Sequence, residues 1–368
     1  MSGRIHDLLI AGGGPAGLAT ALHAVRAGLD VVVAEPRRAP VDKACGEGLM
    51  PGAVRALDRL GIHVPGQAIT GIRYVQGTHQ SCARFRNGPG LGVRRTTLHE
   101  ALHQAVVDAG VPVLPLRVSE VRQEAAGVTV PGTGLRARWL VAADGLHSPL
   151  RRSLGLEVRC VAPPRYGLRR HYAVPPWTTT VEVHWGPHAE AYVTPLGRDL
   201  VGLSLLTNRR APFDTQLADF PHLLDLLPQH AAVTAVRGAG PLRRRSRTRR
   251  HGRVLLVGDA AGYIDALTGE GIFLALAGAE ALVRNVCRDT PHRYESDWKR
   301  VTRRHRYLTE FLTGVRGHPT LGPLIVPVAE RLPRLFAAAV NALAHDVGSR
   351  QHLRVPDRSL SAETQELG

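Results

Sequence analysis

The sequence predicts a mixed α/β (α+β) protein that combines a parallel sheet, an antiparallel sheet and C-terminal helices. Three observations predict this fold class. A strand-type run at Leu8–Ala11, a helix-type run at Leu18–Ala27 and a second apolar run at Val31–Glu35 follow one another, which is typical of a parallel β-α-β unit. From Gly167 to Leu206 the apolar residues alternate as in an antiparallel sheet. From Pro291 onward the pattern is helical.

A glycine cluster joins the first strand to the first helix. Gly12, Gly14 and Gly17 stand in G-x-G-x-x-G register. In this register the first glycine allows a tight turn, the second lets the backbone approach a pyrophosphate, and the third lets helix and strand pack closely. Glu35 ends the second strand, where a carboxylate can accept hydrogen bonds from a ribose hydroxyl. The unit predicts a Rossmann-like dinucleotide-binding domain, and the acid favours FAD or NAD over NADP. The same site is expected to include Pro15, Ala16 and Pro36.

Two further apolar strands end at an acid beside a glycine. At the first, Asp144 can accept hydrogen bonds, Gly145 permits close approach of a ligand, and Arg151 supplies positive charge. At the second, Gly258 and Asp259 precede an Ala-rich helix. A buried strand, an acid, a glycine and a helix start predict a corner that binds an anion or a ribitol chain.

The segment Lys43–Pro51 places a cysteine between glycines and a helix start. Cys45 precedes Gly46 and Gly48, and a helix is expected at Pro51–Leu60. Two glycines beside a cysteine indicate backbone that lies close to a flat ligand. The helix N-terminus is expected to lower the pKa of the Cys45 thiol. Packing of a small side chain is the alternative role for this residue.

In their order, the three glycine motifs resemble those of the p-hydroxybenzoate hydroxylase-type flavoproteins, a superfamily that also holds geranylgeranyl reductases and flavin-dependent halogenases. The resemblance spans about residues 5–285. It implies FAD, with the first glycine motif on the pyrophosphate and Glu35 on the adenosine ribose. It further implies that Arg95 reaches the ribityl-phosphate region, that the Val118 backbone meets adenine, and that Asp259 binds the ribityl chain. The residues that would line the isoalloxazine are Gly269, Glu270, Gly271 and Ile272.

The resemblance leaves the activity open between two classes. The length and the sheet at 167–206 resemble small oxygenases that tailor aromatic polyketides. We therefore expect an NAD(P)H-dependent monooxygenase that hydroxylates an aromatic or polyketide-type small molecule, with His171, His184 or Tyr192 as the base. The alternative is an FAD-dependent reductase of isoprenoid double bonds with Cys45 as proton donor, because Gly262 and the Lys43–Leu49 stretch resemble the geranylgeranyl reductase version.

Two other functions are disfavoured. A flavin-dependent halogenase would need a lysine to carry hypohalous acid, and the chain has only Lys43 and Lys299 and no Trp-x-Trp-x-Ile-Pro stretch. A flavin-binding protein without turnover has no specific support. No His/Cys cluster has metal-ligand spacing, so we expect no metal. The four cysteines are expected to be free thiols.

The 368 residues carry a formal net charge of +16, almost all of the base being arginine. The densest run, at 243–250, is expected to be a solvated face that is dispensable for folding. No aromatic residues interleave with it, so nucleic acid is not expected as a partner. The apolar stretch 321–343 is expected to be a helix pair that caps the core, with a lipid-facing surface as the alternative. The start of the chain carries no signal peptide, so a cytoplasmic protein is expected.

The composition shifts predict three parts. An FAD-binding domain is expected to comprise 1–70, 91–155 and 250–290, and a substrate-binding sheet domain 71–90 and 156–249. Residues 291–368 are expected to form C-terminal helices and a tail that is frayed from Arg354.

Overall fold

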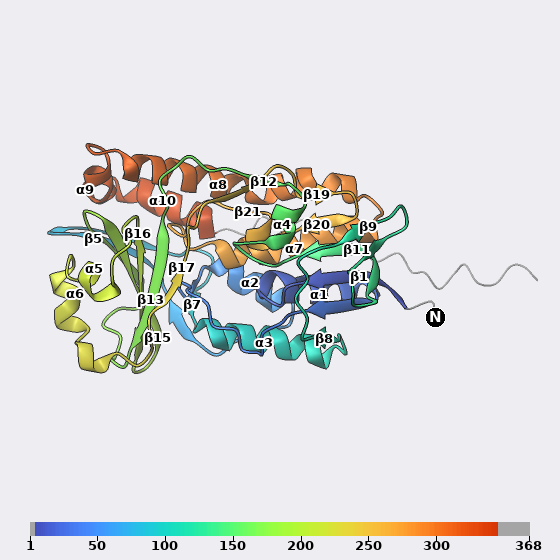
Figure 1. The fold of residues 1–368 in the computed structure, drawn as a ribbon. Helices are drawn as coiled ribbons and strands as arrows, with labels where there is room; N and C mark the ends of the chain where they lie inside the picture. The colour runs from blue at the N-terminus through green and yellow to red at the C-terminus, as the bar shows by residue number, and fades with distance from the viewer. Residues whose placement is uncertain (1–3, 345–368) are drawn as a thin grey trace, which may run out of the picture.

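The computed structural model describes residues 4–344. Two large sheets lie at opposite ends of the molecule, and the C-terminal helices run along one side of both (Figure 1). This mixed α/β arrangement confirms the fold class expected from the sequence. None of the helices in this part of the chain is long and apolar enough to cross a membrane. The expected frayed tail from Arg354 lies outside the described residues.

The first sheet is parallel at its centre, in the order β20-β11-β1-β2-β8. Its central strands are apolar on both faces, and residues 8–11 and 31–34 are all buried. The edges carry the antiparallel strands β19, β10 and β9. The strands are β1 (Ile5–Ala11), β2 (Val31–Ala34), β8 (Val113–Leu114), β9 (Arg122–Gln123), β10 (Val128–Thr129), β11 (Arg136–Ala142), β19 (Arg250–His251) and β20 (Val254–Leu256).

Helix α1 packs between α3 and α7 against this sheet. It is rich in alanine, so the backbones can approach closely, and Leu18 and Leu22 fill the remaining space. Helix α2 also packs on α7. The helices of this half are α1 (Pro15–Arg26), α2 (Pro51–Arg59), α3 (Arg95–Asp108), α4 (Pro149–Ser153), the short η2 (Gly258–Ala260) and α7 (Gly271–Cys287).

The second sheet has the order β17-β13-β16-β15-β14-β5-β6 and is antiparallel except for the parallel pair β14–β5. Its edge hairpin comes from residues 71–84, which interrupt the first half of the chain. Short helices cover one face through Phe213, Leu217 and Leu223. The elements are β5 (Gly71–Gln76), β6 (His79–Arg84), β13 (Tyr166–Tyr172), β14 (Val181–Trp185), β15 (Ala189–Gly197), β16 (Leu200–Thr207), β17 (Arg237–Ala239), α5 (Phe213–Leu217), α6 (Pro221–Leu226) and η1 (Gln229–Ala231).

Two small three-stranded sheets join the halves, in the orders β3-β7-β4 and β12-β18-β21. They bring the segment after β2 and the segment after β20 beside the second sheet, which places both chain segments at the junction. The strands are β3 (Gly48–Leu49), β4 (Gln67–Ile69), β7 (Gly90–Gly92), β12 (Glu157–Val158), β18 (Arg244–Ser246) and β21 (Gly262–Tyr263).

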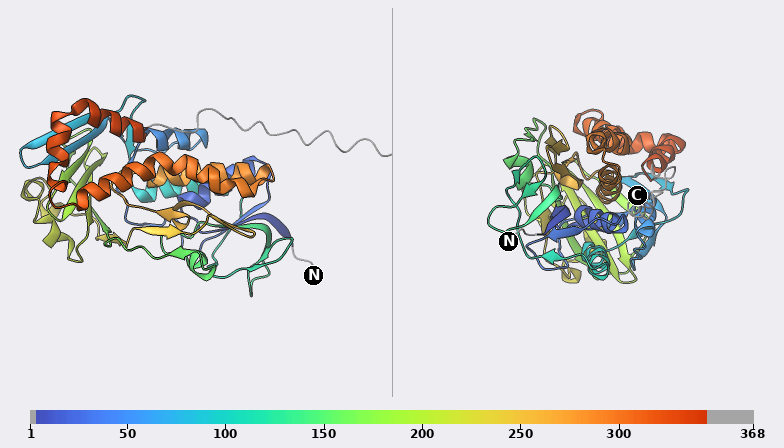
Figure 2. Two further views of the ribbon diagram at one scale, coloured as in Figure 1. Left: turned by 90° about the horizontal axis from the view of Figure 1, so that it is seen from above. Right: turned by 90° about the vertical axis from the view of Figure 1, so that its right-hand side faces the viewer.

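The C-terminal helices bridge the two halves, as Figure 2 shows from above. Helix α8 packs on α7, whereas α9 and α10 pack on β6 of the second sheet. The expected helix pair over 321–343 is thereby confirmed, since Val340 and Phe336 are buried against the sheet. The elements are η3 (Pro291–Arg293), α8 (Tyr294–Gly317), η4 (Gly322–Leu324), α9 (Ile325–Arg331) and α10 (Pro333–Ala344).

The arginine run at 243–250 is not the solvated face that its composition predicts. It forms β18 and β19, and Arg249 is only 7% exposed. The Arg249 guanidinium lies 3.9 Å from the ring centre of Trp298 on α8 and donates to Glu295 at 3.1 Å. Arg247 in the same run is exposed. The expectation is therefore wrong for Arg249, because a helix far along the chain covers it.

Candidate active site at the junction of the two sheets

One cavity of about 840 Å³ extends from the carboxyl ends of β1 and β2 to the second sheet. Its volume lies in the upper part of the range for small-molecule sites. It brings together most residues that the sequence analysis selected. These are Gly12, Gly14, Pro15, Ala16, Glu35, Pro36, Cys45, Gly46, Arg95, Val118, Asp144, Gly145, Tyr192, Gly258, Asp259, Gly269, Gly271 and Ile272.

Each glycine of the first motif has its own steric surroundings. Gly12 has φ +114°, and a Cβ there would lie 2.4 Å from the Ala143 carbonyl oxygen. A Cβ on Gly17 would lie 1.9 Å from the Gly12 carbonyl oxygen, so this glycine serves the packing of helix on strand and does not line the cavity. A Cβ on Gly14 would meet no atom within 4 Å, because this residue faces the open cavity. The N-terminus of α1 begins directly behind it.

Glu35 is buried at the end of β2, where it can accept hydrogen bonds from a ribose. Its carboxylate accepts from the backbone N–H of Gly13 at 2.9 Å and from the side chain of Arg37 at 2.8 Å. Burial raises the pKa of Glu35, but the hydrogen bonds from Arg37 and Gly13 outweigh burial and hold the pKa below its usual value. The carboxylate is therefore ionised at neutral pH and remains an acceptor.

Two buried polar groups in the cavity wall have unused hydrogen-bonding atoms. Within residues 4–344, neither Nη1 of Arg95 nor Oδ1 of Asp144 has a partner. Arg95 is 6% exposed, and the other oxygen of Asp144 accepts from the Leu150 N–H at 3.1 Å. Buried polar atoms are rarely left unpaired, so these two indicate ligand contacts. A cation and an acceptor beside the glycine loop fit the phosphates and ribose of FAD.

The third motif supplies Asp259, whose Oδ2 lies 3.0 Å from Nζ of Lys43 across the cavity. Arg151 does not face the ligand space, contrary to the expectation that its charge serves a ligand. It is fully buried and donates to the carbonyls of Ala260 at 3.0 Å and Leu146 at 2.8 Å. Arg151 therefore fixes the segment after Asp144 to the segment after Asp259.

The segment around Cys45 is held from both halves of the molecule. Its carbonyl accepts from Ser204 of β16 at 3.2 Å, and the Gly46 carbonyl accepts from Thr194 of β15 at 2.8 Å. On the other side, the Glu47 carboxylate accepts from the backbone N–H of Arg95 at 2.7 Å. Cys45 is thus fixed where the polar part of the cavity meets the part lined by the second sheet.

The Cys45 thiol is protonated at neutral pH. Burial raises its pKa, and the nearby Glu47 carboxylate raises it further. The expectation of a lowered pKa is therefore wrong. Helix α2 begins six residues later, at Pro51, and its N-terminal field does not offset burial of the sulfur.

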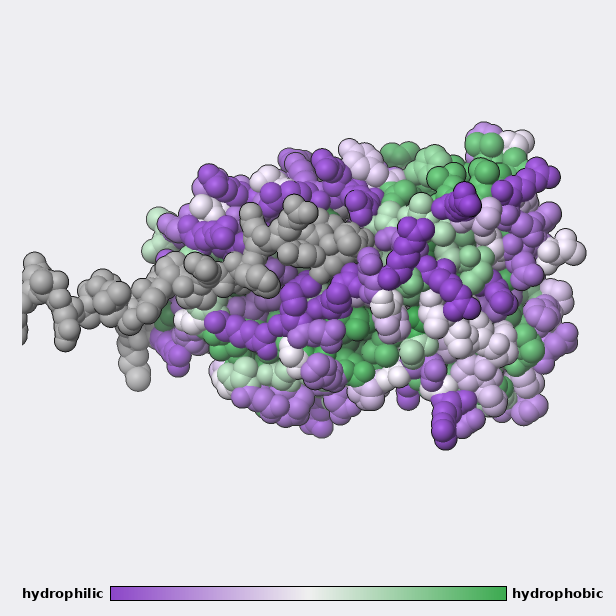
Figure 3. All heavy atoms as spheres, turned by 180° about the vertical axis from the view of Figure 1, so that it is seen from behind, coloured by the Kyte–Doolittle hydropathy of each residue, from purple (hydrophilic) through white to green (hydrophobic). Residues whose placement is uncertain are grey.

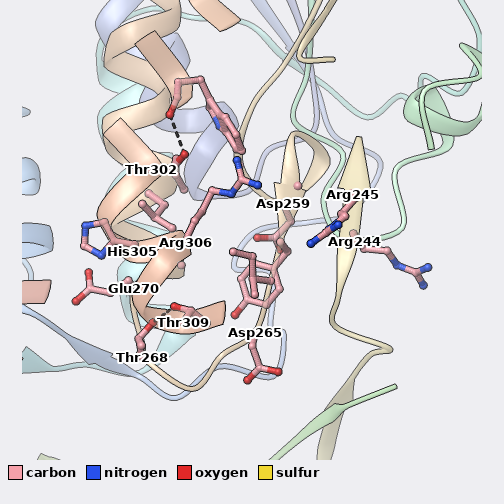
Figure 4. Close-up of a pocket in the computed structure, with 18 of the residues that line it drawn as sticks. Arg244, Arg245, Asp259, Asp265, Thr268, Glu270, Thr302, His305, Arg306 and Thr309 are labelled. Carbon is pink, nitrogen blue, oxygen red and sulfur yellow. Dashed lines mark hydrogen bonds between the residues drawn. The ribbon is translucent and has the colours of Figure 1, made fainter. Parts of the chain in front are cut away.

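Glu270 differs from its neighbours Gly269 and Gly271, because its side chain lines a separate small cavity of about 50 Å³. In Figure 4 its carboxylate lies beside His305 of α8 and away from Asp259. Within residues 4–344 neither carboxylate oxygen has a hydrogen-bond partner. Burial raises the pKa of Glu270 well above its usual value, so it is a neutral acid. In this geometry Glu270 does not line the flavin space, although Gly269 and Gly271 do.

The three candidate bases of the second sheet lie in different places. Tyr192 lines the cavity, and its hydroxyl donates to the Leu267 carbonyl at 3.0 Å. His171 lies behind the wall, with Nε2 2.6 Å from Oε2 of Glu47. His184 lies outside the cavity, 3.2 Å from the Glu182 carboxylate. The structure therefore brings only Tyr192 of these three to the cavity surface.

Sequence reasoning gave no ligand role to two residues of the cavity. Lys43 pairs with Asp259 across 216 positions of the chain, and Glu47 pairs with His171 across 124. No local spacing connects such partners. Only Glu47 had a local sequence signal, because it is an acid inside a glycine-rich segment. In the structure its backbone has a positive φ of 59°.

Comparisons with known proteins identify an FAD-binding domain. The family described as FAD binding domain matches residues 6–164. Together with the motifs and the cavity, this defines an FAD-dependent oxidoreductase. The chain is 30% identical to the menaquinone reductase of Mycobacterium tuberculosis, with 86% of each chain covered. The chain therefore belongs to the family of FAD-dependent oxidoreductases that includes this reductase.

Other relatives include both reductases and monooxygenases. Digeranylgeranylglycerophospholipid reductase 1 of Methanopyrus kandleri is 29% identical, over 73% of this chain and 77% of its own. Para-nitrophenol 4-monooxygenase of a Pseudomonas species is 32% identical, but only over 41% of this chain and 43% of its own. The crystal structure of p-nitrophenol 4-monooxygenase from Pseudomonas putida superposes with a TM-score of 0.75 at 20% identity, covering 92% and 98% of the two chains. That likeness shows a common fold.

Proposed function

We propose that this protein reduces a carbon–carbon double bond in an isoprenoid chain, using FAD. The observation that carries the proposal is the position of Cys45, a half-buried residue with a protonated thiol at the junction of the polar and apolar parts of the cavity. The comparisons support it, because likeness to reductases covers most of the chain whereas likeness to a monooxygenase sequence covers two fifths. Menaquinone and digeranylgeranyl lipids share an isoprenoid chain.

The apolar part of the cavity fits such a chain. Aliphatic side chains of the second sheet and of α10 form much of its wall. They include Ile72, Val181, Val183, Leu206, Val340 and Leu343. A flexible, branched hydrocarbon gains mainly from burial of apolar surface, at about 25 cal/mol per Å². The cavity is therefore suited to hold an isoprenoid segment and to exclude water from the reacting carbons.

Reduction of a double bond adds a hydride to one carbon and a proton to the other. FAD, when bound and reduced, supplies the hydride. In this proposal the Cys45 thiol gives the proton, and its raised pKa keeps the proton in place until substrate binds. The resulting thiolate then recovers a proton from solvent after the product leaves. The Glu47 carboxylate, which neighbours Cys45, is held in place by His171 at 2.6 Å. Arg169 holds His171 in place and also donates to Asp42, which Arg237 contacts at the surface.

We further propose a nicotinamide dinucleotide as the source of reducing equivalents. Arg209 and Arg210 are exposed where they line the cavity, and their guanidinium groups can bind its phosphates. The site assignments above are part of the same proposal, with the FAD phosphates and ribose at the glycine loop, Glu35, Arg95 and Asp259.

Hydroxylation of an aromatic compound is the second candidate. The specific observation in its favour is that Tyr74, Tyr166, Tyr192 and Tyr263 all line the cavity, because aromatic side chains pack well against an aromatic ligand. Burial raises the pKa of Tyr192 well above its usual value, so this phenol stays protonated at neutral pH and is not poised to accept a proton from a substrate. Cys45 would then need only to be small.

The decisive variant is Cys45→Ala, assayed without oxygen on a geranylgeranyl lipid in detergent. We expect the rate of double-bond reduction to fall at least about 100-fold, the usual contribution of a general acid, with FAD still bound and reducible. Cys82→Ala is the matched control, since that thiol is exposed on β6 and lies outside the cavity. A normal rate of reduction in Cys45→Ala would contradict the role. Hydroxylation of a phenol that survives in Cys45→Ala would favour the second candidate.

A further inference from the structure

The C-terminal helices present apolar side chains to solvent. Of the thirteen exposed large hydrophobic residues in the described part of the chain, seven lie between Tyr307 and Leu335. On α8, Tyr307 and Phe311 are 69% and 65% exposed and stand one helical turn apart. We call this set the apolar face; it comprises Tyr307, Phe311, Leu321, Leu324, Val328, Leu332 and Leu335.

Helix α9 is apolar on both sides. Val326 and Ala329 are buried toward the second sheet, whereas Val328 and the flanking Leu324 and Leu332 are exposed at intervals of four residues. Exposed apolar side chains on the face opposite the buried one indicate a second partner for this segment. The elements are contiguous, because η4 contacts α8 and α9, and α9 contacts α10. Figure 3 shows hydrophobic side chains gathered at the upper right, over the end of the molecule where α9 and α10 lie.

Helix α10 connects this face to the proposed substrate cavity. Leu335 near its start is 62% exposed, whereas Val340 and Leu343 further along line the cavity. The same short helix therefore contributes to the apolar face and to the wall that would contact an isoprenoid chain. A substrate of that kind is stored in lipid and not in water.

The charge around the apolar face is strongly positive. Residues 300–335 contain seven arginines and two glutamates. Arg331 and Arg334 are exposed on either side of Leu332, and Arg303 is exposed one turn before Tyr307. Apolar side chains bordered by arginine are the combination that binds an anionic lipid surface. A second copy of this chain would bring an equally basic surface against the first, so self-association is disfavoured.

We propose that the apolar face docks on an anionic lipid bilayer and positions the enzyme to take its substrate from the lipid phase. The face rests on the surface through side chains of α8, η4, α9 and α10, and the arginines contact the lipid phosphates. The substrate class invoked rests on the proposed function. The docking proposal itself rests on the exposed apolar side chains and the surrounding arginines, and not on catalysis. Vesicle binding therefore tests it independently of turnover.

The test is sedimentation of the FAD-loaded full chain with vesicles of equal parts phosphatidylglycerol and phosphatidylcholine. We expect wild-type protein to bind these vesicles at least tenfold more tightly than vesicles of phosphatidylcholine alone. The triple variant Leu324→Ser, Val328→Ser, Leu332→Ser should bind at least tenfold more weakly. The variant Arg331→Gln, Arg334→Gln alters no buried side chain and should lose most of the preference for the anionic vesicles.

The control is Val161→Ser with Val233→Ser, which removes two exposed apolar side chains elsewhere, the first being 95% exposed. This control should bind vesicles like wild type. Equal vesicle binding by wild type and the triple variant, or no binding by wild type, would overturn the proposal. Sedimentation velocity gives a further check, because a dimer that the triple variant abolishes would reassign the face to self-association. Normal turnover of detergent-dispersed lipid by the triple variant, together with lost vesicle binding, would support docking.

Discussion

Replacing Arg249 with alanine should destabilise the fold, although the residue sits in a run that looks like a solvated basic surface. Its guanidinium stacks on Trp298 at 3.9 Å and donates to the Glu295 carboxylate at 3.1 Å. A hydrogen bond to a charged group contributes about 1.5–3 kcal/mol, and a cation–π contact about 0.5–1 kcal/mol. Burial of the guanidinium costs part of this, and Lys299 also contacts Glu295 at 3.1 Å. We therefore expect a net loss of about 2 kcal/mol in the free energy of unfolding.

The assay is urea unfolding of the FAD-loaded protein, followed by Trp fluorescence and by circular dichroism. The matched control is Arg247→Ala, two residues away, whose side chain is exposed. This control removes the same charge and should change the free energy of unfolding by no more than about 0.5 kcal/mol. If both variants unfold at the urea concentration of the wild type, the structural role of Arg249 is refuted. If both lose about 2 kcal/mol, net charge and not the Trp298 contact is responsible.

Three further predictions concern the cofactor site and pH. Gly14→Val should abolish FAD binding while the circular dichroism stays native, because the added side chain enters the open cavity; normal FAD content on purification would contradict the pyrophosphate assignment. Asp259→Ala should lower FAD affinity about 10- to 100-fold in fluorescence titrations, the equivalent of about 1.5–3 kcal/mol, and unchanged affinity would remove its ribityl role. Burial, and to a smaller extent the nearby charge of Arg304, lowers the pKa of His305 to about 4. Between about pH 6.5 and about pH 4 the unfolded chain therefore binds a proton at this residue that the folded protein does not bind. Stability should therefore fall as pH drops from about 6.5 to about 4, and His305→Leu should make that slope shallower by about 1.4 kcal/mol per pH unit in urea unfolding; an unchanged slope would show that His305 is protonated in the fold.

The parts of the fold that could be predicted are those in which sequence neighbours determine the structure. The run Leu8–Ala11, its glycine turn and Val31–Ala34 form a local β-α-β unit, and each glycine has its own steric reason. The alternation at Val181–Trp185 is equally local, since successive side chains of a strand point to opposite faces of its sheet. These local patterns were enough to predict the fold class and most of the residues that line the cavity.

The parts that could not be predicted depend on contacts between distant segments. The Arg249 guanidinium pairs with Glu295 and stacks on Trp298. The sequence near residue 249 gives no sign of either distant partner. The pKa of Cys45 was misjudged because a helix start is visible in the sequence, whereas burial under the second sheet is not. The side-chain direction of Glu270 depends in the same way on α8, which supplies His305 to the small cavity.

The most direct test of the proposed function is a single-turnover experiment on anaerobic enzyme with its FAD reduced in advance. The enzyme is mixed with a geranylgeranyl lipid, and flavin absorbance and the mass of the lipid are followed together. The proposal predicts that the flavin reoxidises without oxygen and that the lipid gains two hydrogen atoms per flavin. A flavin that stays reduced with the lipid, but reoxidises on addition of oxygen and a phenol to give a hydroxylated product, would contradict the reductase and establish the monooxygenase.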